Sequence, residues 1–213
     1  MNLTNDQSSA LIREHLLRSA AVKQSLAEQC LREISDAASL IAEALESGGK
    51  ILLCGNGGSA ADCQHIAAEF ASVLSKDFLR PPMAAIALTT DTSFLTANAN
   101  DFGFEGIFAR QIEALGRRRD VLVAISTSGS SPNVIRAVSR ARELGLQTIV
   151  LTGSREGQLA HMADVAIKVP SENTSHIQES HIAIGHAICA VVEQSMFGSR
   201  SQAIASGQSE GTF

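Results

Sequence analysis

The order of segments along the chain predicts an α/β protein with a mostly parallel sheet covered by helices. Short apolar runs bounded by turn residues alternate with segments of helical periodicity, which is typical of βαβ units. Polar loops at 55–59, 89–92, 126–131 and 152–154 follow four of the predicted strands. Because ligands of such sheets bind at the carboxyl ends of the strands, we expect the functional site among these loops.

Length and composition favour one domain and restrict the partners. The chain has 213 residues, 45% of them hydrophobic, so it can bury a substantial core. The net charge of -5 gives no support for nucleic-acid binding. No apolar run approaches the roughly 20 residues of a membrane span, and the polar N-terminus lacks the apolar core of a signal peptide. The four cysteines lack C-x-x-C spacing and are interpreted as reduced core thiols, so we expect a cytoplasmic protein without membrane or nucleic-acid partners.

An N-terminal helical segment, residues 1–47, precedes the first strand. Apolar residues recur at helical spacing over 5–47, and Ser47-Gly48-Gly49 indicates the end of the helix. The apolar stripe needs a cover, which either the rest of the chain or a partner subunit can provide, and the sequence leaves both open. The main domain is assigned to 48–197, and the Ser-, Gly- and Gln-rich tail, 198–213, is expected to be disordered.

The first strand leads into a glycine-rich turn. Ile51–Cys54 is predicted as a buried strand, and Gly55, Gly57 and Gly58 allow a sharp turn close to a ligand. Ser59 is predicted as the N-cap of the next helix. The amino end of a helix behind such a turn suits an anion such as phosphate.

Two helices carry side chains that can bind a metal. His65 and Glu69 are one turn apart on the first helix after the glycine turn, so both can reach the same point. The last predicted helix adds Gln178, His181 and His186, and spacing alone does not choose between the two histidines. Together these residues offer nitrogen and oxygen donors suited to Zn²⁺, although their spacing is not a known zinc motif.

The middle of the chain supplies the other elements. We expect further strands at 84–88, 121–125, 147–151 and 165–169, and helices ending near 97 and spanning 104–115, 132–144, 158–162 and 175–197. A polar turn is expected at 98–101. The run Arg117-Arg118-Arg119 is interpreted as a solvated helix end rather than a binding patch.

A cluster of hydroxyl groups follows the third predicted strand: Ser126, Thr127, Ser128, Ser130 and Ser131. The proline that comes next favours the start of a helix, with the last of these serines as its cap. A phosphate here would accept bonds from hydroxyl and backbone N–H groups, so we predict a phosphate cradle. Neither this loop nor the glycine turn matches the Walker A or G-x-G-x-x-G pattern, which argues against a nucleotide.

Four motifs carry a resemblance to a known family: CGNGGSAADCQHIAAEF, ANANDFGF, AISTSGSSPNVIRA and HIQESHIAIGH. From about Leu11 to Phe197 the chain resembles the bacterial phosphoheptose isomerases of the sugar-isomerase (SIS) domain superfamily. The resemblance implies a flavodoxin-like αβα sandwich with a five-stranded parallel sheet, and a homotetramer with active sites between subunits. It also implies conversion of sedoheptulose 7-phosphate to D-glycero-D-manno-heptose 7-phosphate through a metal-stabilised cis-enediol, the first step toward activated heptose and lipopolysaccharide.

The resemblance also implies the residues of the site. As ligands of one Zn²⁺ per subunit it implies His65, Glu69, Gln178 and His186. As substrate-binding residues it implies Asn56, Gly57, Gly58, Ser59, Asn100, Asp101, Ser126, Thr127, Ser128, Ser131 and Gln178. Aldose–ketose isomerisation needs a base beside the carbon and an acid near the oxygens, and we hypothesise that Glu69 removes the carbon proton and His186 exchanges protons with the sugar oxygens.

The chain departs from the family pattern in two places. The segment Ser72–Leu79 lacks an arginine found in some relatives, which leaves Lys76 or Arg80 as the predicted cation. Ser175 and His176 stand where some members place an acidic residue before Ile-Gln.

Three alternative functions share the predicted fold. A paralogous, non-catalytic class that associates with the bacterial replication initiator lacks the glutamate and histidine at the positions of Glu69 and His186, so their presence favours an enzyme. A sugar-phosphate sensor would normally carry a DNA-binding module, which the sequence does not show. The sequence does not exclude an isomerase of another phosphosugar.

Overall fold

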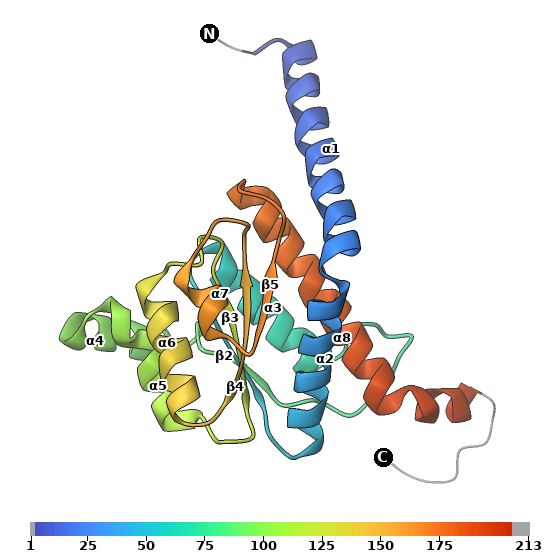
Figure 1. Ribbon diagram of the computed structural model, residues 1–213. Coiled ribbons are helices and arrows are strands. Elements are labelled where there is room, and N and C mark those ends of the chain that lie inside the picture. The colour runs from blue at the N-terminus through green and yellow to red at the C-terminus, as the bar shows by residue number, and fades with distance from the viewer. Residues whose placement is uncertain (1–2, 206–213) are drawn as a thin grey trace.

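A five-stranded parallel sheet lies at the centre of the computed structural model, which describes residues 3–205 (Figure 1). The strands are β1 (Ile51–Gly55), β2 (Ala85–Ala87), β3 (Val121–Ile125), β4 (Gln147–Thr152) and β5 (Val165–Lys168). Their order is β2-β1-β3-β4-β5, with every pair parallel. This is the flavodoxin-like order, and the predicted αβα sandwich is confirmed.

Helices cover both faces of the sheet because side chains alternate along each buried strand. Ile51 and Leu53 of β1 join the core on the side of α2 (Leu31–Glu46), α3 (Gly58–Ala71) and α8 (Thr174–Ala205). Leu52 and Cys54 face the opposite core, which contains residues of α5 (Ile107–Leu115), α6 (Pro132–Glu143) and α7 (Gln158–Met162). The two groups of helices lie on opposite sides of the sheet in Figure 1. All four cysteines are buried and free, as predicted.

The N-terminal helical segment is two helices rather than one. α1 (Asn5–Gln29) and α2 meet at Cys30, whose backbone leaves the helical region at φ -122°. α2 packs into the same core as the sheet, through residues such as Ala37 and Ile41. α1 extends away from the body of the molecule (Figure 1), and only Ser19 and Leu26 are buried along it. The apolar stripe is thus divided: the chain covers its second half and leaves most of the first exposed.

Two predicted irregular segments are helical in the structure. The polar turn predicted at 98–101 is the end of α4 (Thr92–Phe102). Asp91 caps the start of this helix through the Phe94 N–H, and Asn98 is buried along it. A short 3-10 helix, Phe104–Gly106, then leads into α5. The tail predicted to be disordered from 198 is helical as far as Ala205, because adding residues to an existing helix requires no new nucleus. Residues 206–213 lie outside the described part of the chain.

Candidate functional site

The glycine turn sets the start of α3 at the carboxyl end of β1. Gly57 has φ 55° and ψ -120°, a conformation that favours glycine, and the helix begins at Gly58. Ser59 therefore lies inside the helix and is buried, so its prediction as the N-cap was wrong. No side chain caps α3. Its first N–H groups thus face the carboxyl edge of the sheet, where an anionic or polar ligand can accept them.

Close contact between α3 and α8 brings the metal-capable side chains together. Gly185 of α8 lies against Ile66 of α3 so closely that an added Cβ would be 2.6 Å from the Ile66 Cδ1 atom. On the same surface the Nε2 atoms of His65 and His186 are 2.9 Å apart, and His65 Nε2 is 3.3 Å from Glu69 Oε1. One ligand atom from each of these three residues lies within 4.8 Å of the others. Two imidazole nitrogens and a carboxylate oxygen facing one point are a donor set that fits Zn²⁺.

The structure separates the two histidines that spacing alone could not. His181 is fully buried, and its Nε2 lies 3.3 Å from the Thr152 carbonyl oxygen. Burial lowers the pKa of His181 to about 4, so this ring is neutral and part of the core. His186 instead meets His65, as the family resemblance implies. Gln178 extends over the first turn of α3, where its Nε2 would be 1.6 Å from a Cβ added to Gly58.

The hydroxyl loop lies at the neighbouring strand end, because β1 and β3 are adjacent in the sheet. Ser126 Oγ is 3.0 Å from Ser131 Oγ and 3.4 Å from Ser128 Oγ, and Ser130 Oγ donates to Ser128 Oγ at 3.1 Å. Ser131 occupies the N-cap position of α6, but its side chain makes no capping bond. The hydroxyl groups therefore converge on one another beside a helix amino end, and this arrangement can hold a phosphate.

Two polar residues of this region were missed by sequence reasoning. Asn133 forms a pair of hydrogen bonds with Asn56, both at 2.8 Å, and its only sequence signal is its place after Ser-Pro at a helix start. Asp62 precedes His65 by one helical turn and is half-buried. Its Oδ2 has no hydrogen-bond partner within residues 3–205. Burial raises the pKa of Asp62 to about 6, an effect that nearby His65 opposes.

Two predicted substrate residues and one predicted cation lie on other elements of the chain. Asn100 and Asp101 are exposed near the end of α4, where Asn100 Nδ2 donates to Asp101 Oδ1 at 2.8 Å. α4 packs against α5 and the short 3-10 helix. Lys76 is exposed in the segment between α3 and β2.

Arg80 cannot be the cation that contacts the substrate, which corrects that prediction. Its side chain is fully buried, and its Nε donates to Glu193 Oε1 at 2.8 Å. Its remaining N–H groups donate to backbone carbonyls, among them those of Glu69 and Phe70 at the end of α3. Arg80 therefore holds the carboxyl end of the helix that carries Glu69, and Lys76 remains the predicted cation.

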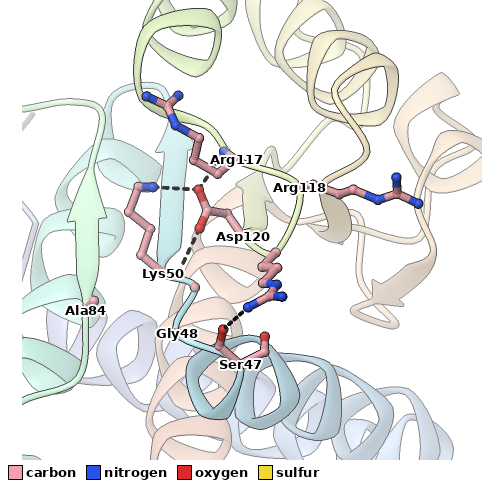
Figure 2. Close-up of a pocket in the computed structure, with 9 residues that line it drawn as sticks. Ser47, Gly48, Lys50, Ala84, Arg117, Arg118 and Asp120 are labelled. Atoms are coloured by element: carbon pink, nitrogen blue, oxygen red, sulfur yellow. Dashed lines mark hydrogen bonds and ion pairs between the residues drawn. The ribbon is translucent and has the colours of Figure 1, made fainter.

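A cavity of about 450 Å³ lies at the opposite edge of the sheet, lined by Ser47–Lys50, Ala84 and Arg117–Asp120 (Figure 2). The carboxylate of Asp120 in this cavity already accepts three hydrogen bonds: from Lys50 Nζ at 2.6 Å, from Lys50 N at 2.9 Å and from Arg117 N at 2.8 Å. Arg119 donates to the Ser47 carbonyl oxygen at the end of α2, at 3.0 Å. These cations stabilise helix carboxyl ends and a buried carboxylate, which agrees with the interpretation of the arginine run as a solvated helix end.

Comparison with known proteins identifies the family. The family model described as SIS domain matches residues 15–153. The chain is 49% identical over 188 residues to a phosphoheptose isomerase of Aneurinibacillus thermoaerophilus, which covers 87% of this chain and 94% of that protein. The chain belongs to the phosphoheptose isomerases of the SIS domain family. It is therefore an enzyme, an aldose–ketose isomerase.

Solved structures of phosphoheptose isomerases agree in fold. One from Neisseria gonorrhoeae has a TM-score of 0.82 and 45% identity, covering 87% of this chain and 98% of that one. Another, from Francisella tularensis, has a TM-score of 0.84 and 39% identity, covering 88% and 98%. The SIS fold predicted from the sequence is thus confirmed. Within residues 3–205, no helix combines the length and apolar character needed to cross a membrane.

Proposed function

We propose that this phosphoheptose isomerase converts sedoheptulose 7-phosphate to D-glycero-D-manno-heptose 7-phosphate, the first step toward activated heptose. The observation that carries the proposal is the meeting of His65, Glu69 and His186 between α3 and α8, at the end of the sheet that also bears the hydroxyl loop. A sugar phosphate has an anionic end and a carbonyl end, and these two groups of residues offer one binding element for each.

The proposed metal ligands are His65, Glu69, Gln178 and His186, holding one Zn²⁺ per subunit. Two imidazole nitrogens, a carboxylate oxygen and a carboxamide oxygen would give four donors suited to this ion. When bound, Zn²⁺ polarises a sugar carbonyl and lowers the energy of negative charge on its oxygen. Support comes from the 2.9 Å approach of the two histidine Nε2 atoms and from the position of Gln178 over the first turn of α3.

The chain's own residues would move the protons. Isomerisation shifts one hydrogen between C1 and C2 of the sugar and requires a base beside the carbon and an acid–base group beside the oxygens. Glu69 is the proposed base that takes the carbon proton and returns it to the neighbouring carbon. His186 is the proposed group that moves a proton between the two oxygens, so that the cis-enediol forms and collapses without net proton loss. The Arg80 bond to the Glu69 carbonyl oxygen, 2.7 Å long, fixes the helix end that carries the base.

The hydroxyl loop would hold the phosphate. Ser126, Thr127, Ser128 and Ser131 can donate to its oxygens, and the positive end of the α6 helix dipole adds to this attraction. Binding energy from this remote, unreactive group orients the sugar for proton transfer. The glycine turn, Asn56 to Ser59, would contact the sugar between the two ends.

We also propose a homotetramer with active sites between subunits. α1 leaves large apolar side chains open to solvent: Leu11, Ile12, Leu16 and Leu17 are 54% to 62% exposed. A helix face of this kind is stable when a second copy covers it. Exposed Asn100 and Asp101 on α4 could then complete the site of a neighbouring subunit.

The function is tested by incubating the zinc-loaded protein with sedoheptulose 7-phosphate and following the aldose product by NMR. We expect the heptose 7-phosphate to accumulate to equilibrium, and the Glu69→Gln variant to form far less of it. If the protein converted a different ketose phosphate faster than sedoheptulose 7-phosphate, that sugar would be the substrate and the present assignment would be wrong. No conversion of any phosphosugar with or without Zn²⁺ would overturn the proposal.

A further inference from the structure

We infer that Asn133 is a positioning residue that fixes the Asn56 side chain and so sets the geometry of the sugar-binding turn. This inference rests on the proposed function, since Asn56 is the proposed sugar contact. The two side chains form a reciprocal pair: Asn56 Nδ2 donates to Asn133 Oδ1, and Asn133 Nδ2 donates to Asn56 Oδ1, both at 2.8 Å.

A third hydrogen bond decides which way the Asn133 amide points. Asn133 Oδ1 also accepts from the Val134 backbone N–H at 3.0 Å. A backbone N–H can only donate, so the Asn133 atom beside it must be the oxygen, and the NH₂ group of Asn133 is then the atom that meets the Asn56 oxygen. Asn133 is 2% exposed, so water cannot replace these partners without opening the site.

The Asn133 amide in turn determines what Asn56 can offer a ligand. Asn56 has two N–H donors and two acceptor lone pairs, and the pair uses one of each. One donor and one acceptor therefore remain, in directions that the pair fixes. Without Asn133, the partly exposed Asn56 could rotate about χ2 and present its amide in either orientation.

The pair bridges the two halves of the site. β1 and β3 are neighbours, and Gly55 lies opposite Ile125 at their carboxyl ends. From there the chain runs to α3 on one face of the sheet and to α6 on the other. Asn56 leaves β1 and Asn133 lies in the first turn of α6, so their hydrogen bonds span the crevice where the connections diverge. They therefore tie the glycine turn to the hydroxyl loop, and with it the sugar end to the phosphate end.

The test is a double-mutant cycle on kcat/KM for sedoheptulose 7-phosphate with Asn56→Ala, Asn133→Ala and the double variant. Because a misplacement of about 1 Å in a site can cost ~100-fold in rate, we expect Asn133→Ala to lower kcat/KM by about 10- to 100-fold. In the Asn56→Ala background the same change should have an effect of no more than about twofold, since Asn133 would act only through Asn56. Equal losses in both backgrounds, or a single variant with wild-type kcat/KM, would overturn the inference.

A second measurement does not depend on catalytic activity. In ¹⁵N spectra of the wild-type protein, the Asn56 side-chain NH₂ signals, assigned by their absence in Asn56→Ala, should exchange with water more slowly than those of exposed asparagines. Exchange as fast as in a free asparagine would contradict the pairing. If the wild type fails to convert sedoheptulose 7-phosphate, the proposed function fails, while this exchange measurement still decides whether Asn133 fixes Asn56.

Discussion

Replacing Gly58 by alanine tests the role of Gln178 without touching Gln178 itself. A Cβ at position 58 would lie 1.6 Å from Gln178 Nε2 and 2.4 Å from its Cδ. Non-bonded heavy atoms prefer separations of about 3.5–4 Å, so the carboxamide must move by roughly 2 Å. The long side chain of Gln178 can make this movement at little energetic expense, because the three atoms nearest the new methyl group all belong to the far end of this flexible side chain.

The backbone at position 58 accepts alanine. Gly58 is the first residue of α3 and is not among the glycines with positive φ. Alanine is favoured over glycine in a helix by about 0.5–1 kcal/mol, so the free energy of unfolding should stay constant or rise slightly. Losing a hydrogen-bond partner behind a metal ligand already lowers metal affinity about 10- to 100-fold. Displacing the proposed ligand itself should lower Zn²⁺ affinity at least tenfold, and kcat/KM with it.

The matched control is Gly57→Ala, which should lower stability and leave Zn²⁺ affinity almost unchanged. Gly57 has φ 55°, and an added Cβ meets no atom within 4 Å. Alanine there should cost about 1–3 kcal/mol of stability through backbone strain and leave Zn²⁺ affinity within about twofold of wild type. Calorimetric zinc titration and urea unfolding separate the two profiles. If Gly58→Ala binds Zn²⁺ as tightly as wild type, Gln178 is not a ligand and the reasoning is refuted.

Three further predictions concern other residues. Glu69→Gln should lower kcat at least 100-fold because it removes the proposed base, and near wild-type turnover would show that another group takes the carbon proton. Arg80→Met should destabilise the fold by about 3–5 kcal/mol in urea unfolding, since it leaves Glu193 buried without its partner, and a loss below 1 kcal/mol would contradict this. Burial lowers the pKa of His181 to about 4. As the pH falls from 6.5 to 4, the unfolded chain therefore takes up a proton on this ring that the folded protein does not, and the free energy of unfolding decreases. Between pH 7 and pH 5 this should cost about 2 kcal/mol, a loss that His181→Gln should not show.

The fold could be predicted largely from local patterns. The apolar runs at 121–125 and 147–151 are bounded by turn residues, so strand positions followed from the sequence, and their order in the sheet follows from right-handed parallel crossovers. The break at Cys30 could not be predicted, because Leu31 continues the same helical periodicity beyond it. The start of α3 at Gly58 was also missed, because serine is the commoner cap and the φ of Gly57 is not a sequence property.

The site could be predicted in part. Helical spacing places His65 and Glu69 together, but the choice between His181 and His186 depends on how α8 is rotated against α3, which residue types alone do not determine. Arg80 was a candidate substrate cation because the segment Ser72–Leu79 lacks the arginine that some relatives carry. Its burial depends on Glu193, 113 residues later in the chain. The partnership of Asn56 with Asn133 likewise arises only when two strand ends meet across the sheet.

The central claim is that α3 and α8 together hold one metal ion on which the isomerase activity depends. The most direct measurement is a zinc titration of chelator-treated protein, with isomerisation of sedoheptulose 7-phosphate followed by NMR at each addition. Activity should be lost on chelation, rise linearly with added Zn²⁺, and level off at one equivalent per chain. Full activity in protein freed of metal, or a plateau at a different ratio, would contradict the account.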